Sequence, residues 1–193
     1  MEVASATVTM KWLFLIQDNE NAGDKDKFKM KSKLSHVDGA GNPRMVDVSE
    51  KKITRRTARA QAIVYLGKKI IGEIRNKELI TKKGPVFQTA IIAGVMGAKN
   101  TASLIPFCHP LGLEDCQITI SVQKEKVIIH SLTVVNGRTG VEMEALTAVS
   151  VAALTVYDMC KALSHDMVIE EIKLMEKTGG KKDFKRNDGN GNR

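Results

Sequence analysis

Aromatic residues are scarce in this chain of 193 residues. They make up 4% of the sequence, whereas hydrophobic residues as a whole make up 42%. The core must therefore be built from Ile, Val, Leu, Met and Ala. RNA-binding modules commonly stack bases on aromatic side chains beside basic ones, and the few Phe, Tyr and Trp residues form no such cluster. Nucleic acid is therefore a minor alternative, although the formal net charge of +8 favours some anionic partner.

Cysteines and long hydrophobic runs are also few. Cys108, Cys116 and Cys160 are widely spaced and form no CxxC pair, which argues against a disulfide framework or a zinc ribbon. The apolar run WLFLI at 12–16 is far shorter than the roughly 20 residues that span a bilayer, and no cleavage signal clearly follows it. We therefore expect a cytoplasmic protein with no membrane partner.

The composition divides the chain into three parts. Residues 17–33 are polar and of mixed charge, so residues 1–33 are predicted to be a flexible N-terminal extension. Residues 181–193 are basic and rich in Gly and Asn, and they predict a mobile tail. Residues 34–180 are then expected to form a single α+β domain.

Hydrophobic periodicity predicts a mixed order of strands and helices within that domain. Strands are expected at 58–66, 116–123, 126–135 and 167–177. An apolar stripe of helical spacing covers 68–80, Pro85 would open a second helix at its first position, and 141–163 gives the strongest helix prediction. This order favours an antiparallel sheet covered on one face by helices.

The segment LIPFCHPLGL at 104–113 places a cysteine and a histidine between two prolines. Each proline disfavours helix for the residue before it, so His109 should lie on a short non-helical connection. A histidine held in this way could be a general acid or base, a metal ligand or a phosphate contact. It could equally be an ordinary turn residue.

Charged residues lie at both ends of the helix predicted at 141–163. Asp158 and Lys161 are three residues apart and can project from one face. Charges on so apolar a helix are expensive unless they are paired or used, which favours function over a surface ion pair. Glu142 and Glu144 near the helix start are explained more simply by the helix dipole.

Two further segments have features that bind anions. Lys83 precedes a predicted helix, where free N–H groups and the positive end of the helix dipole favour an anion. Lys177 and Lys181 belong to the run KTGGKK, which combines flexible backbone with positive charge but lacks the spacing of a P-loop. Either segment could contact a phosphate.

Five segments also carry a resemblance that covers most of the chain, from about Leu34 to Phe184. They are MVDVS at 45–49, KKGPVFQTAIIAG at 82–94, LIPFCHPL at 104–111, TGVEMEALTAVSVAALTVYDMCKAL at 139–163 and KTGGKK at 177–182. Together they resemble the cyclic pyranopterin monophosphate synthase family, whose members catalyse the second step of molybdenum cofactor biosynthesis.

The resemblance implies a ferredoxin-like fold and an enzyme of the phosphorus–oxygen lyase class. Its substrate would be 3',8-cyclo-7,8-dihydroguanosine triphosphate, and its products cyclic pyranopterin monophosphate and pyrophosphate. It also implies a homohexamer, a trimer of dimers, with active sites at the subunit interface. No cofactor is expected to be required and no metal site is expected, although Mg²⁺ could accompany the triphosphate.

Matching residue by residue, the resemblance implies two sets of site residues. The catalytic set is Lys83, His109, Asp158 and Lys161. The substrate-binding set is Arg56, Cys108, His109, Glu142, Met143, Glu144, Lys177 and Lys181. Lys161 beside Asp158 would be the central acid–base pair, and partial burial near other cations would lower the pKa of Lys161 towards neutrality.

Three positions depart from the family pattern: Pro85 stands where aspartate is more common, Arg138 where lysine is usual, and KKDF replaces a glycine-containing C-terminal loop.

The length of the helix predicted at 141–163 limits which residues can share one site. Glu144 and Asp158 are 158 − 144 = 14 residues apart, so an unbroken helix separates them by roughly 21 Å. Either the helix begins after Glu144 or neighbouring subunits share each site, and we favour the second.

Overall fold

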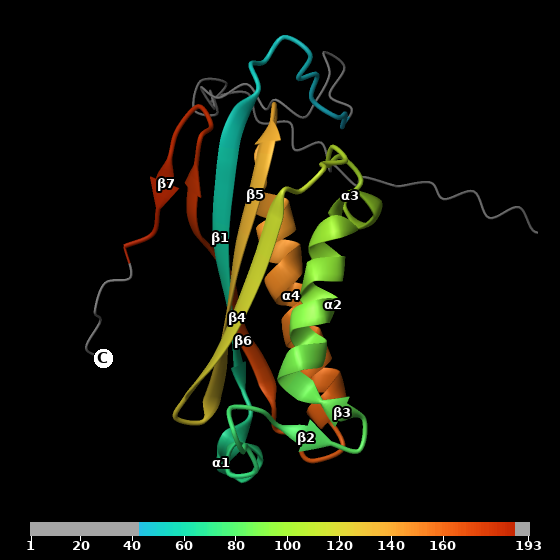
Figure 1. Ribbon diagram of the computed structural model, residues 1–193, viewed down its shortest axis with the longest axis vertical. Helices are drawn as coiled ribbons and strands as arrows, with labels where there is room; N and C mark the ends of the chain where they lie inside the picture. Colours follow the sequence, from blue (N-terminus) through green and yellow to red (C-terminus); the bar gives the residue numbers. More distant parts are fainter. Residues whose placement is uncertain (1–42, 188–193) are drawn as a thin grey trace, which may run out of the picture. The chain divides into compact units, whose positions relative to one another are not determined.

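A five-stranded antiparallel sheet carries two long helices on one face (Figure 1). The computed structural model describes residues 43–187; the flexible extension predicted at 1–33 and the end of the predicted tail at 188–193 lie outside them. The sheet order is β4-β5-β1-β6-β7, with β1 at Thr54–Tyr65, β4 at Asp115–Gln123, β5 at Lys126–Gly137, β6 at Val168–Thr178 and β7 at Phe184–Lys185. The predicted ferredoxin-like α+β fold is confirmed.

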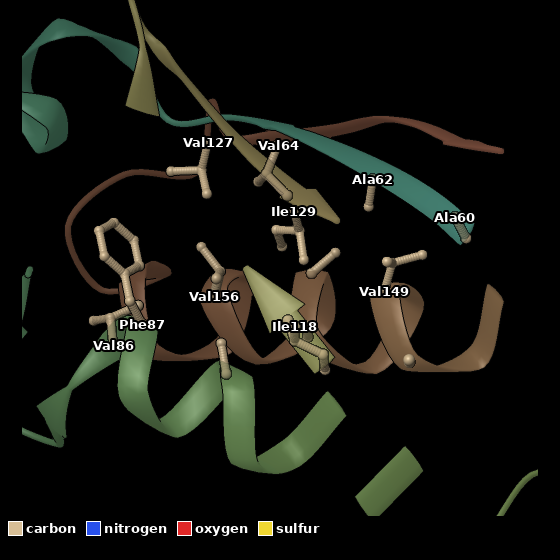
Figure 2. Close-up of a cluster of buried hydrophobic side chains, with 14 of the residues drawn as sticks. Ala60, Ala62, Val64, Val86, Phe87, Ile118, Val127, Ile129, Val149 and Val156 are labelled. Atoms are coloured by element: carbon tan, nitrogen blue, oxygen red, sulfur yellow. The ribbon is translucent and has the colours of Figure 1, made fainter. Parts of the chain in front are cut away.

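The helices α2 (Val86–Lys99) and α4 (Glu142–Cys160) pack side by side over the sheet. Alternate residues of β1 face them, as Figure 2 shows for Ala60, Ala62 and Val64. These three side chains are fully buried. α4 meets the length and composition of a membrane-crossing helix, but half of that stretch is buried inside the fold. Its apolar surface is thus used in the core.

Glycines allow α2 to approach α4 closely. A Cβ added at Gly94 would lie 2.8 Å from the carbonyl oxygen of Ala148, and one at Gly97 would lie 2.7 Å from a methyl of Val151. The small residues of α2 therefore serve close helix packing.

The prediction of a helix over 68–80 is correct only for the first turn. α1 covers only Gly67–Ile71, and the chain then turns at Asn76 and Lys77, both of which have positive φ. Two short strands follow, β2 at Ile80–Thr81 and β3 at Gly84–Pro85. The apolar residues of the stripe still pack against the core, but those beyond Ile71 lie among turns and short bridges. Their spacing is therefore that of a helix although the backbone there is not helical.

Smaller differences concern element ends. Pro85 precedes α2 as an extended N-cap instead of opening the helix, and a short helix α3 (Thr101–Leu104) follows α2. Within the tail expected to be mobile, Phe184–Lys185 form β7 and pair with β6. The tail prediction stands untested for residues 188–193, which lie outside the described part.

Candidate active site

Three charged side chains meet at the C-terminal end of α4, and we call them the Asp158 cluster. The Lys83 ammonium donates to Oδ2 of Asp158 at 2.7 Å, and the Lys161 ammonium lies 2.8 Å from Oδ1. The pairing with Lys161 and Lys83 lowers the pKa of Asp158 to about 2. Asp158 is therefore an ionised carboxylate throughout the neutral range, with one lysine on each oxygen.

The structure corrects the expected state of Lys161. Its side chain is 56% exposed rather than partly buried, and its closest charged partner is an anion, not a cation. The hydrogen bond that Lys161 donates to Asp158 therefore raises the pKa of Lys161 instead of lowering it. At neutral pH Lys161 is a cation and a proton donor, so it does not act as a free base while Asp158 holds it.

Lys83 reaches this cluster from the tip of the β2–β3 hairpin. Thr81 pairs with Gly84, which leaves Lys82 and Lys83 as the two-residue connection, and Gly84 has a φ of +110°. The Lys83 ammonium also donates to the Asp158 carbonyl oxygen at 3.0 Å. That oxygen is one of the last in α4, so Lys83 caps the negative end of the helix dipole.

The anion site expected at the start of α2 is filled by the protein itself. Glu78 accepts hydrogen bonds there from the backbone N–H groups of Phe87 and Gln88. Lys83 lies near the beginning of α2 in sequence, yet its charge is used at the end of α4.

A basic hollow of about 240 Å³ lies at the other end of α4, and we call it the anion pocket. The antiparallel register places the start of β1 beside the ends of β5 and β6, next to the first turn of α4. The residues that line the pocket are Lys51, Arg56, Thr57, Arg138, Thr139, Gly140, Val141, Glu142, Lys177, Thr178, Gly180 and Lys181. Four predicted site residues thus come together: Arg56, Glu142, Lys177 and Lys181.

The strand ends around the anion pocket are tied together by hydrogen bonds. Arg56 donates through Nε to the Gly137 carbonyl at 3.0 Å, and Thr54 donates to the Gly179 carbonyl at 2.8 Å. Gly179 has a φ of +80°, and its N–H donates to Asp183 at 3.0 Å. The KTGG loop at 177–180 is therefore held as a turn beside the pocket. The acceptor Asp183 belongs to KKDF at 181–184, the segment that departs from the family pattern.

Glu142 provides the pocket's carboxylate. Its Oε1 accepts from the Lys177 ammonium at 2.9 Å, and both side chains are about two-thirds buried. Four further cations line the same hollow without an ion pair among residues 43–187: Lys51, Arg56, Arg138 and Lys181. The pocket therefore has spare positive charge for a bound anion.

Sequence reasoning missed Lys51, and it noted Arg138 only as a departure from the family. The Arg138 guanidinium donates to the Lys51 carbonyl at 3.1 Å, which joins the segment before β1 to the end of β5. Lys51 follows the MVDVS motif closely, which is the one sequence signal that could have found it.

His109 lies on a non-helical connection, as the flanking prolines predicted. It lines a hollow of about 360 Å³ together with Asp47, Ser49 and Arg138. Arg138 also lines the anion pocket, so His109 belongs to the same end of the molecule. The structure therefore groups His109 with the substrate-binding candidates and not with Asp158.

Glu144 is the most buried acid of the site. It is 4% exposed, and its Oε2 has no hydrogen-bond partner among the described residues. Burial raises the pKa of this carboxyl, which favours its protonated form. Burial and the charge of Glu144 also raise the pKa of the Cys108 thiol, whereas Met143 beside them is 37% exposed.

The two ends of α4 are too far apart to act together within one chain. The helix is continuous from Glu142 to Cys160, which excludes the alternative that it begins after Glu144. Glu142 and Asp158 are 158 − 142 = 16 residues apart, or roughly 24 Å along the axis. A pocket of 300–1,000 Å³ is only about 7–10 Å across.

No group of three or more His, Cys, Asp or Glu residues that could hold a metal ion occurs within residues 43–187. The absence of a protein-held metal site and the accompanying Mg²⁺ both stay predictions.

Comparison with known proteins gives consistent relatives. A Xanthomonas campestris protein named cyclic pyranopterin monophosphate synthase is 50% identical over 155 residues, which cover 79% of this chain and 93% of the relative. Molybdenum cofactor biosynthesis protein 1 of Drosophila melanogaster is 51% identical over 157 residues, and that of Dictyostelium discoideum is 45% identical over 168 residues. The two matches include 80% and 78% of this chain, respectively, but only 27% of the length of each longer protein.

The family assignment rests on a span that contains both charged groups. Residues 45–180 match the model of the MoaC family. The matched residues include Lys83, Asp158 and Lys161 at one end of α4, and Arg56 and Lys177 at the other. Together with relatives that are half identical over most of this chain, the match shows that the chain belongs to the MoaC family.

Proposed function

We propose that this chain is a cyclic pyranopterin monophosphate synthase acting in molybdenum cofactor biosynthesis. It converts 3',8-cyclo-7,8-dihydroguanosine triphosphate into cyclic pyranopterin monophosphate and pyrophosphate. The proposal rests mainly on one observation: an anion pocket and a separate carboxylate–lysine cluster, of which all residues but Lys181 lie within the span that matches the MoaC family.

The anion pocket binds the triphosphate of the substrate. Lys51, Arg56, Arg138 and Lys181 provide cations, and the positive end of α4 adds to their field. Closing the cyclic phosphate forms a bond from a sugar oxygen to the α-phosphorus while the bond to pyrophosphate breaks. Negative charge then builds on the leaving pyrophosphate, where preorganised cations stabilise it.

The Asp158 cluster handles protons during the ring rearrangement. Lys161 is protonated and donates, whereas Asp158 is ionised and orients two ammonium groups. For Lys161 to accept a proton from the substrate, its contact with Asp158 must first be weakened or replaced. Such a change would release the constraint that raises the pKa of Lys161.

Each active site combines the anion pocket of one subunit with the Asp158 cluster of a neighbour. The separation of roughly 24 Å along an unbroken α4 supports this arrangement, because a two-fold related copy brings opposite ends of the same surface together. The assembly that we propose is a hexamer, a trimer of dimers, located in the cytoplasm. His109, Met143 and Glu144 complete the substrate side of each site.

Incubation of the purified chain with the cyclised dihydro-GTP tests this function. We expect release of pyrophosphate and formation of an oxidisable pterin. Folded protein that binds the triphosphate but releases no pyrophosphate would instead be a nucleotide-binding module. An Asp158→Asn variant separates the two cases further, since a binder would keep its affinity for the anion whereas an enzyme would lose turnover.

A further inference from the structure

Glu78 is an acidic residue that joins the hairpin bearing Lys83 to the start of α2. Its Oε1 accepts from the N–H groups of Leu79 and Phe87, both at 2.8 Å, and its Oε2 accepts from the N–H of Gln88 at 3.0 Å. The Leu79 carbonyl accepts from the N–H of Val86 at 2.9 Å. The first three N–H groups of α2 are thus all bonded to residues 78 and 79.

This capping compensates for what the local sequence lacks. Pro85 is the N-cap of α2 and makes no side-chain capping bond, although the first N–H groups of a helix need acceptors. Glu78 supplies them from seven residues before Pro85, and its negative charge lies at the positive end of the helix dipole. The carboxylate therefore closes a loop of the chain from residue 78 to residue 88.

Glu78 is itself fixed by a tight turn. The backbone N–H and carbonyl groups of Arg75 and Glu78 exchange two hydrogen bonds of 2.9 Å, with Asn76 and Lys77 at positive φ between them. The β2–β3 hairpin leaves from this turn and returns into α2. Both of its ends are consequently bonded to one side chain, and Lys83 stands at its tip.

We propose that Glu78 is a positioning residue for the Asp158 cluster: by bonding both ends of the hairpin, it fixes where the Lys83 ammonium stands against Asp158. Within the hairpin itself the connection is slight, since only two residue pairs join β2 to β3. Without Glu78, the first turn of α2 loses two acceptors and the base of the hairpin opens. Lys83 then samples positions away from Asp158. This inference rests on the proposed function only for its effect on turnover.

The test compares Glu78→Ala and Glu78→Gln with two references. Glu73→Gln is the matched control, because Glu73 is exposed and its side chain makes no hydrogen bond or ion pair within the described chain. Lys83→Ala marks the complete loss of the ammonium. Turnover is measured on the cyclised dihydro-GTP well below each variant's Tm, and the Asp158 carboxyl is titrated by ¹³C NMR from pH 6 downwards.

We expect Glu78→Ala to lower kcat by about 10²-fold with KM changed by less than about threefold, as for a misplaced catalytic group. The pKa of Asp158 should rise from about 2 towards its value in Lys83→Ala. Glu78→Gln should show a smaller loss, because its amide oxygen can still accept from Leu79 and Phe87 while its N–H₂ group opposes the N–H of Gln88. Glu73→Gln should match the wild type.

A lower Tm with unchanged kcat and unchanged Asp158 pKa in Glu78→Ala would overturn the proposal, since Glu78 would then only stabilise the fold. If Glu78→Ala does not fold, wild-type values of both quantities in Glu78→Gln would overturn it equally. A wild type without lyase activity whose Asp158 pKa still rises in Glu78→Ala would contradict the proposed function and support the positioning role.

Discussion

The two ends of α4 hold charge in opposite ways. At the C-terminal end, Asp158 is bonded to Lys83 and Lys161, so the charged groups of the cluster satisfy one another. At the N-terminal end, Glu142 pairs with Lys177, but other cations around the pocket have no anionic partner within the described chain. Paired charges fix geometry, and unpaired charges bind a ligand. This difference supports the proposed roles, with chemistry at the C-terminal end of the helix and substrate binding at the N-terminal end.

Burial differs between the two ends as well. The side chains of the Asp158 cluster are about half exposed in the single chain, which is unusual for groups that carry out proton transfer. Glu144 at the opposite end is almost fully buried. An exposed acid–base cluster needs another surface to exclude water from it, and the proposed assembly provides one in the neighbouring subunit.

The largest loss of turnover is expected from substitutions at the C-terminal end of α4, where the charges are paired. Lys83→Ala and Lys161→Ala should each lower kcat by about 10²–10⁴-fold, because each removes a positioned cation or proton donor. Lys82→Ala is the matched control, since Lys82 is the neighbouring residue of the same turn and is exposed. Steady-state kinetics measure the effect. Near-normal turnover in folded Lys161→Ala would remove the central role of the cluster.

A smaller loss is expected from substitutions in the anion pocket, at the N-terminal end of α4. Arg56→Ala should weaken binding of inorganic triphosphate by about 10–100-fold, the loss of one charge-assisted hydrogen bond. Lys177→Ala should weaken it by a similar factor, because it leaves the Glu142 carboxylate in the pocket without its cation. The loss should appear mainly in KM and should shrink as salt is raised. Lys185→Ala, on the short edge strand β7, serves as control. Calorimetry that finds equal triphosphate affinity in Arg56→Ala and the wild type would contradict the assignment of the pocket.

The smallest effect is the change in folding stability with pH that the Glu144 carboxyl causes. Its pKa is raised in the folded chain, so the unfolded chain ionises first as pH rises above about 4.5, and stability falls with rising pH. Glu144→Gln removes this titration while keeping the shape of the protonated acid. The Tm difference between Glu144→Gln and wild type should therefore shift in favour of the variant from pH 4 to pH 8. A difference that does not change with pH would mean that Glu144 is not held protonated.

Much of the fold followed from the sequence because its strands and helices are regular. The β4–β5 hairpin with its two-residue turn, the apolar helix α4 and the strand β6 were predicted within a few residues. The segment 72–85 was not, because its apolar residues share the spacing of a helix although Gly72, Asn76 and Gly84 impose turns. Glu78 was missed for the same reason, since its bonds to the start of α2 depend on those turns.

The candidate site could be predicted as residues but not as geometry. The Asp158–Lys161 spacing predicted a pair, and the pair is present. That Lys83 reaches the same carboxylate from 75 residues away depends on the packing of the hairpin against α4. Local patterns gave no signal for that contact, nor for the exposure of Lys161, which leaves the hydrogen bond to Asp158 as the main cause of its raised pKa.

The central claim, that opposite ends of α4 from two subunits form one site, is tested by mixing two inactive variants. Lys177→Ala weakens the anion pocket and Asp158→Asn disables the cluster, so each parent oligomer is nearly inactive when turnover is measured at substrate concentrations well below the wild-type KM. Random pairing makes about half of the interfaces mixed, and each mixed interface holds one intact site of two, so co-expressed oligomers should recover about a quarter of wild-type turnover. Verified mixed oligomers no more active than the two parents would contradict the account.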